Sequence, residues 1–203
     1  MGERKTKTSS KTTKSTRPKM SSTISHHGGS SAGNAKLVRC PEDILNRLRR
    51  MNEAEVITLF TPFVPHPPSS TLARDMDPFE ALGRALPRQV RHVPYLMDRG
   101  MTEWHADFLP ASGAAVIVIC VTDNVISSSP RAFEQQVNFA RDIWRKIAET
   151  KSIAGIPAVM LLVSSDAAGR AYADAMQEFP ALVMINDYTT AALANAVRVL
   201  FGQ

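Results

Sequence analysis

The sequence predicts an α/β fold, a three-layer α/β/α sandwich with a mostly parallel sheet of about five strands. The main observation is a pattern that recurs three times towards the end of the chain. In each repeat a short apolar run, at 114–121, 157–163 and 181–185, precedes polar residues and then an amphipathic stretch. Apolar strands joined through helices are typical of a parallel sheet that helices cover on both faces.

Length and charge indicate one folded domain after a basic tail. The chain has 203 residues, 44% of them hydrophobic, enough for a single core. Residues 1–35 are rich in Ser, Thr and Lys and carry seven basic side chains and one acidic, so we expect a disordered tail there and one α/β domain over 36–203. The net charge of +5 is therefore +6 on the tail and −1 on the body, and no nucleic-acid partner is predicted for the folded body.

The first predicted elements surround a proline-rich loop. Apolar residues at helical spacing predict a helix from Pro41 to about Met51, and residues 55–60 are interpreted as the first strand. The four prolines of 61–68 exclude regular structure. This rigid loop lies at the carboxyl end of a strand, a common place for a ligand site.

Each later element has its own start or stop signal. Asp77 as N-cap, followed by Pro78 and Glu80, predicts a helix that ends near Leu86. Further elements are expected at 90–95 (strand), 102–108 (brief helix capped by Thr102), 129–149 (the longest helix), 166–178 (helix) and 189–201 (helix closed by Gly202).

Polar residues directly after the strands are the candidate ligand-lining set. In open α/β sheets ligands bind at the carboxyl ends of strands. The candidates are Thr61, Asp123, Asn124, Asp166 and Asp187. The three aspartates suit either of two roles, paired carboxylates on one rim as in a glycosidase, or ordinary helix caps and turn formers. Both interpretations stay open.

Signatures of several enzyme classes are absent from the sequence. A phosphate-binding loop after a strand, the G-x-G-x-x-G fingerprint and the G-x-S-x-G elbow are missing, and the five histidines have no metal-ligand spacing on one element. We therefore predict no cofactor, no metal and no catalytic residue. The longest apolar run has eight residues and no secretory signal is seen, so no membrane span and a cytoplasmic protein are expected.

Two signals in the tail leave alternatives open. Gly2 matches a loose myristoylation pattern, although the carboxylate of Glu3 is unfavourable, and the Ser- and Arg/Lys-rich composition is similar to that of a transit peptide. A solvated tail is favoured. Cys40 and Cys120 do not form a disulfide framework.

Several short segments, in order from Val56 to Gln203, together resemble the carboxy-terminal domain of glycoside hydrolase family 3, on the β-N-acetylhexosaminidase side. They are Thr61-Pro62 with residues 67–70, then 77–86, 90–95, 100–109, 188–193 and 197–202. The resemblance implies a sandwich-like α/β domain that accompanies an amino-terminal catalytic barrel. The barrel's nucleophile and its Lys-His…Pro-Gly…Asp-Ser/Thr-His signature have no counterpart in this sequence, so no catalytic residue is carried over.

The resemblance therefore implies an accessory function, not self-sufficient hydrolysis: carbohydrate-related binding, or docking onto a glycosidase barrel chain or a second copy of this chain. An exposed apolar patch or a homodimer is expected from a face that evolved covered. The alternative is a degenerate small-GTPase-like or flavodoxin-like module that acts in protein interaction. A pocket formed by the loop 61–70 with Asp123 and Asp166 would favour the sugar site. A loop packed flat on the surface would favour interaction. A piece of a longer enzyme is a third interpretation.

Overall fold

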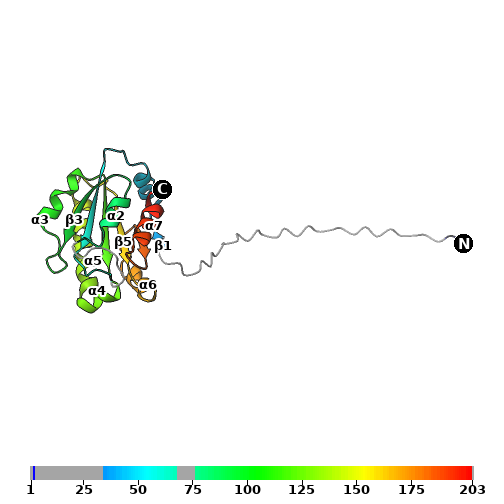
Figure 1. Ribbon diagram of the computed structural model, residues 1–203. Coiled ribbons are helices and arrows are strands. Elements are labelled where there is room, and N and C mark those ends of the chain that lie inside the picture. Colours follow the sequence, from blue (N-terminus) through cyan, green and yellow to red (C-terminus); the bar gives the residue numbers. More distant parts are fainter. Residues whose placement is uncertain (1, 3–33, 68–75, 203) are drawn as a thin grey trace.

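Six strands form a single sheet in a computed structural model that describes residues 2, 34–67 and 76–202 (Figure 1). The order across the sheet is β1-β6-β5-β4-β2-β3. The strands are β1 (Ala35–Arg39), β2 (Val56–Pro62), β3 (Gln89–Tyr95), β4 (Ala114–Cys120), β5 (Ala158–Val163) and β6 (Leu182–Ile185). The α/β class and the mostly parallel sheet predicted from the apolar runs are confirmed.

The strand β1 is an addition to the predicted sheet. It pairs antiparallel with β6, Ala35 opposite Ile185, whereas all other pairs are parallel. Its sequence, Ala-Lys-Leu-Val-Arg, lacks the continuous apolar run of the central strands because Lys36 and Leu37 are exposed at the sheet's edge. In Figure 1 β1 lies beside the carboxy-terminal helix, so the two ends of the described domain pack together.

Helices cover both faces of the sheet and make the outer layers. They are α1 (Glu42–Arg49), α2 (Glu80–Ala85), α3 (Glu103–Asp107), a 3-10 turn at Leu109–Ala111, α4 (Asp123–Ser128), α5 (Ala132–Glu149), α6 (Asp166–Ala175) and α7 (Thr190–Phe201). One core cluster joins the sheet to α1, α2 and α7, and a second joins it to α5 and α6. The predicted three-layer sandwich is confirmed.

Several helix boundaries differ from those expected. The predicted long helix is preceded by a separate short helix, α4, and Pro130 lies in the turn between α4 and α5. The helix α2 begins at Glu80, but Asp77 makes the contact expected of an N-cap, because its carboxylate accepts the Phe79 N–H (2.7 Å). The helix α6 ends at Ala175, three residues early. Gly202 closes α7 with φ of 74°, as expected for a C-cap glycine.

The strand β2 continues into the segment expected to be irregular, through Thr61 and Pro62. Proline is tolerated there because β2 pairs with β4 only as far as Phe60, so the side to which Pro62 would donate has no ladder partner. The following residue, Phe63, donates its N–H to the Tyr95 carbonyl (3.0 Å). The loop proper therefore begins at Phe63.

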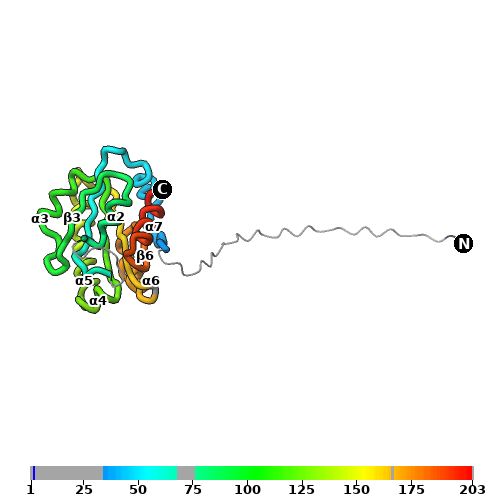
Figure 2. Tube along the Cα trace, in the orientation of Figure 1, coloured from blue at the N-terminus to red at the C-terminus, as the bar shows by residue number. Residues whose placement is uncertain are grey.

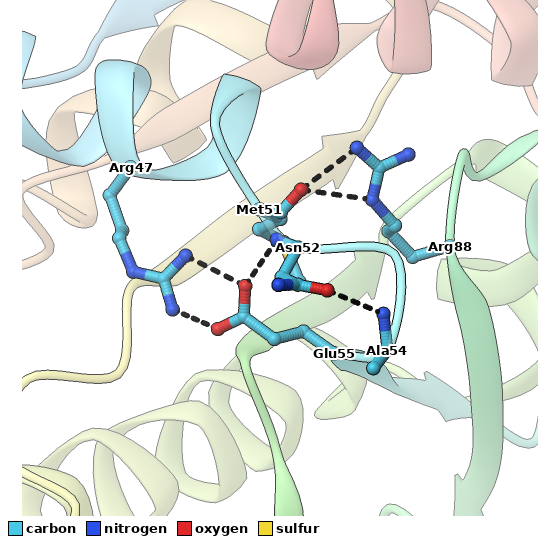
Figure 3. A network of polar contacts seen from close by, with 6 residues as sticks. All are labelled: Arg47, Met51, Asn52, Ala54, Glu55 and Arg88. Atoms are coloured by element: carbon cyan, nitrogen blue, oxygen red, sulfur yellow. Dashed lines mark hydrogen bonds and ion pairs between the residues drawn. The ribbon is translucent and has the colours of Figure 1, made fainter.

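At the amino ends of the strands, a polar network fixes the connection between α1 and β2 (Figure 3). Glu55 accepts hydrogen bonds from Arg47 and from the N–H of Asn52, and Arg88 donates twice to the Met51 carbonyl (3.1 and 2.8 Å). The hydrogen bond from Arg47 is the main reason that the pKa of Glu55 is lowered. Figure 2 shows this connection and α4 at opposite ends of the sheet.

Predictions for the tail 1–35 fall almost wholly outside the described residues, although Asn34 and Ala35 are described and Ala35 begins β1. The same holds for Pro68, Ser69 and Ser70 of the proline-rich loop. Within the described residues, no helix has both the length and the apolar character needed to cross a membrane. Both cysteines, Cys40 and Cys120, are free.

Candidate functional site

The parallel part of the sheet has one point at which the strand order reverses. Counted without β1, its five strands follow the flavodoxin-like order 2-1-3-4-5, and the reversal falls between β2 and β4. In open α/β sheets a ligand usually binds in the crevice outside the carboxyl ends of the two strands at this point. The candidates Thr61, Asp123 and Asn124 belong to this region.

On one face, buried side chains fill the gap where β2 and β4 separate. Tyr95 donates its hydroxyl to the Val118 carbonyl (2.8 Å). Gln136 of α5 accepts the Cys120 N–H (2.7 Å) and donates to the Cys120 carbonyl (2.8 Å). Both side chains are buried, and the Tyr95 ring stacks on Phe139 at 3.7 Å. These groups satisfy backbone atoms of β4 that no neighbouring strand reaches.

On the other face, a second network ties together the loops after β2, β4 and β6. Asn124 donates to the Tyr188 hydroxyl (2.9 Å) and to the His66 carbonyl (3.3 Å). Tyr188 donates in turn to the Pro65 carbonyl (2.9 Å), and its ring stacks on Phe79 with centroids 5.6 Å apart. Burial raises the pKa of Tyr188, so its hydroxyl stays protonated and can donate. The loop after β2 is therefore anchored across the crevice.

The structure places the five predicted candidates in different surroundings. Thr61 is fully buried, and its hydroxyl hydrogen-bonds the Nε2 of His92 (2.7 Å). Asp187 accepts from the N–H and hydroxyl of Thr189 (2.8 and 2.6 Å), the turn-forming role that the sequence left open. Asp123 is exposed at the start of α4.

The remaining two candidates are Asn124 and Asp166. Asn124 joins the loop network above, so the structure brings it together with the segment after Thr61. Asp166 begins α6, and its side chain lies outside the described part. The described part of the loop after β2 is thus tied to Asn124, the neighbour of Asp123, and the cavities lined by described residues do not include Asp123.

A cavity of about 310 Å³ lies beside this anchored loop. Its lining residues come from the end of β2 and the turn before α2: Pro62, Phe63, Val64, His66, Met76, Asp77 and Pro78. The Phe63 side chain is 66% exposed, and the adjacent Leu96 is 45% exposed. The proline-rich segment was the sequence signal for this place, whereas Phe63 and Asp77 were not among the candidates.

Two polar side chains, His66 and Asp77, line this cavity, and His92 lies behind Asp77. The Oδ2 of Asp77 lies 3.9 Å from the Nε2 of His92, and both side chains are about one quarter exposed. The Nδ1 of His66 is buried and has no hydrogen-bond partner among the described residues. Thr61 and Asp77 both face the same nitrogen of His92, whereas a nucleophile triad needs its acid on the opposite ring nitrogen. Thr61, His92 and Asp77 therefore do not have the geometry of a nucleophile triad.

Comparison with solved structures shows what the fold is similar to. A fungal multi-domain GH3 β-N-acetylglucosaminidase matches 84% of this chain at 16% identity and a TM-score of 0.55. A glycoside hydrolase family 3 β-N-acetylglucosaminidase from Paenibacillus sp. str. FPU-7 matches 83% of it at 14% identity and a TM-score of 0.51. This chain spans 16% and 28% of the length of those two proteins. No family model and no curated protein matches the chain.

These likenesses confirm the fold that the sequence resemblance implied. The domain has the α/β architecture found in part of β-N-acetylglucosaminidases of glycoside hydrolase family 3. At this level of identity the likeness concerns the fold alone, since one fold serves many activities.

Proposed function

We propose that this chain is an accessory domain of the glycoside hydrolase type. It binds a carbohydrate-related ligand or docks onto a glycosidase barrel, and it does not hydrolyse glycosides by itself. The observation that carries the proposal is the shared fold, over more than four fifths of the chain, with parts of two β-N-acetylglucosaminidases. A cytoplasmic location is part of this proposal, and two free cysteines are compatible with it.

Contacts of the candidate residues support binding over hydrolysis. A glycosidase needs two carboxyl groups that face each other across the scissile bond. Asp187 is instead engaged by Thr189 at the start of α7, and Thr61 is buried against His92. We propose Asp123 and Asn124 as rim residues of the ligand-binding end, because Asp123 is exposed and Asn124 fixes the loop after β2.

Two measurements on the full chain test this function. Immobilised N-acetylglucosamine oligomers should retain the protein, or a pull-down should recover a glycosidase barrel chain in a complex that survives gel filtration. Aryl N-acetylglucosaminides should not be turned over. Turnover that persists after rigorous removal of contaminating hexosaminidase would disprove the non-catalytic assignment. Failure to bind either glycans or a barrel would disprove the accessory function.

A second candidate, a protein-interaction module of flavodoxin-like fold, is favoured by one observation. Trp104 of α3 is 55% exposed and packs edge-on against Phe108 (4.8 Å), so an aromatic surface faces solvent. This candidate predicts a protein partner whose binding Trp104→Ala weakens and N-acetylglucosamine oligomers do not affect. Competition by the oligomers would instead favour the accessory domain.

A further inference from the structure

We infer that the cavity beside the end of β2 binds a single sugar ring, with Phe63 as the platform for its apolar face and Asp77 as the acceptor of a hydroxyl group. The inference rests on the proposed function and deepens it, since it assigns the site and the ligand class. At about 310 Å³ the cavity is at the lower end of the usual size of small-molecule sites, which suits a monosaccharide unit and not a long chain.

Phe63 has the exposure and the rigidity that a stacking platform needs. Its side chain is 66% exposed although it lines the cavity, so one ring face is available to a ligand. Its backbone N–H is held by the Tyr95 carbonyl (3.0 Å), and the prolines on the same wall restrict the chain further. Aromatic rings contribute a large apolar contact with little loss of conformational entropy, and pyranose rings have an apolar face.

Asp77 is oriented before any ligand arrives. Its Oδ1 accepts the Phe79 N–H (2.7 Å), which fixes the plane of the carboxylate. Its Oδ2 is 3.9 Å from the Nε2 of His92, which is too long for a hydrogen bond. That imidazole nitrogen is engaged by the Thr61 hydroxyl (2.7 Å), so Oδ2 keeps its capacity to accept from a sugar hydroxyl.

The wall that carries His66 is also preorganised. The His66 carbonyl accepts from Asn124, and the neighbouring Pro65 carbonyl accepts from Tyr188. Because these contacts exist in the free protein, a ligand has little ordering of this wall to offset, which favours affinity.

A second cavity of about 310 Å³, at the opposite end of the sheet, provides a matched control. It is lined by Asp43, Ile44 and Arg47 of α1, by apolar residues of α5 and of the connection to β5, and by Trp144, whose exposure is 37%, so it too places a carboxylate near an exposed aromatic ring. The charged Arg47 on its wall is already paired with Glu55. Phe63→Ala and Trp144→Ala therefore each remove one exposed aromatic ring beside a cavity of similar size, and they differ mainly in which cavity they affect.

The experiment is a titration of the full-length, ¹⁵N-labelled protein with N-acetylglucosamine, N,N′-diacetylchitobiose and glucose, followed by NMR shift changes. The variants are Phe63→Ala, Asp77→Asn and the control Trp144→Ala. Asp77→Asn keeps an oxygen for the Phe79 N–H. We expect shifts around 62–66 and 76–79, an affinity loss on the order of tenfold for Phe63→Ala and for Asp77→Asn, and no change for Trp144→Ala. Spectra of the unliganded variants verify folding, and Phe63→Leu replaces Phe63→Ala if that variant does not fold.

The outcomes separate this site from the proposed function. Sugar binding that survives Phe63→Ala and Asp77→Asn but is lost in Trp144→Ala would overturn the site and leave the function standing. Binding that none of the three substitutions alters would do the same. Absence of binding of all three sugars to the wild-type protein would overturn this site, whereas recovery of a barrel partner in the pull-down would still support the accessory function.

Discussion

Gln136 shows at the scale of a single residue how the crevice between β2 and β4 is closed. Its amide satisfies both backbone groups of Cys120, and the side chain is fully buried. Gln136→Leu leaves that N–H and that carbonyl buried without partners. We expect the free energy of unfolding to fall by about 3 kcal/mol. Urea unfolding measures the loss.

The neighbouring glutamine provides the control for this substitution. Gln135 is on the same helix but only half-buried, so Gln135→Leu should change the free energy of unfolding by less than about 1 kcal/mol. Equal losses in the two variants would contradict the role assigned to the Gln136 amide.

The two thiols, Cys40 and Cys120, are expected to differ in reactivity because they are buried to different extents. Burial raises the pKa of Cys120 to about 12 and also raises the pKa of Cys40, which is only half-buried. The thiolate is the reactive form. In native protein at pH 8 we expect an aromatic disulfide reagent to modify Cys40 slowly and Cys120 only after unfolding. Counting modified thiols with and without denaturant, in wild type and Cys40→Ser, checks this. Native modification of Cys120 at the rate of Cys40 would refute it.

At the scale of elements, Arg39 attaches β1 to the rest of the fold. Its guanidinium donates to the carbonyls of Phe179 (2.8 Å) and Met176, just beyond α6. Arg39→Ala removes both hydrogen bonds, and we expect a loss of about 1–3 kcal/mol of stability. Relative to the wild type, Arg39→Ala should also speed up amide hydrogen exchange more in β1 than in β4, because only the edge strand loses its attachment.

Two variants sharpen the interpretation of Arg39. Lys36→Ala, on the same strand and exposed, should leave both readouts unchanged. Arg39→Lys should recover less than half of the loss, because one ammonium group does not reproduce the planar two-donor geometry. Full recovery by lysine would indicate that charge, not geometry, attaches the strand.

The elements also show why part of the fold could be predicted and part could not. The strands β4, β5 and β6 are apolar on both faces, so the sequence alone indicates them and their parallel arrangement. The strand β1 escaped prediction because an edge strand needs no apolar run, and its partner β6 lies almost 150 residues away in sequence. Such a pairing depends on the assembled sheet.

The candidate site was predictable only in its location. The polar residues after the strands do gather at one end of the sheet, and the proline-rich loop does border a cavity. Which side chains are available to a ligand could not be deduced from the sequence. Asn124 hydrogen-bonds Tyr188 and Asp187 hydrogen-bonds Thr189, and these contacts depend on the folded structure. Phe63 carries no sequence signal, since a buried and an exposed phenylalanine look alike in a sequence.

For the whole molecule, the buried imidazole of His105 links stability to pH. It is 6% exposed, lies edge-on to Phe139 (5.1 Å), and its Nδ1 accepts the Thr102 N–H (3.1 Å). A proton on Nδ1 would break that hydrogen bond and bury a charge. Burial accordingly lowers the pKa of His105 below its usual value of 6.5. The unfolded chain then binds more protons below pH 6.5, so stability is greatest above that pH and falls as the pH drops towards the lowered pKa.

This dependence is distinguishable from that of the carboxylates. Hydrogen bonds from Arg47 and Arg141 lower the pKa of Glu55 and Glu178, so their contributions are lost only as the pH falls below about 4.5. Between pH 7.5 and 5 we therefore expect the urea midpoint of the wild type to fall because of His105. His105→Gln keeps an acceptor for the Thr102 N–H and cannot titrate, so its midpoint should stay nearly constant over that range. Parallel curves for the two proteins would show that the acid sensitivity of the fold arises elsewhere, whereas a flat curve for His105→Gln alone assigns it to this one buried ring.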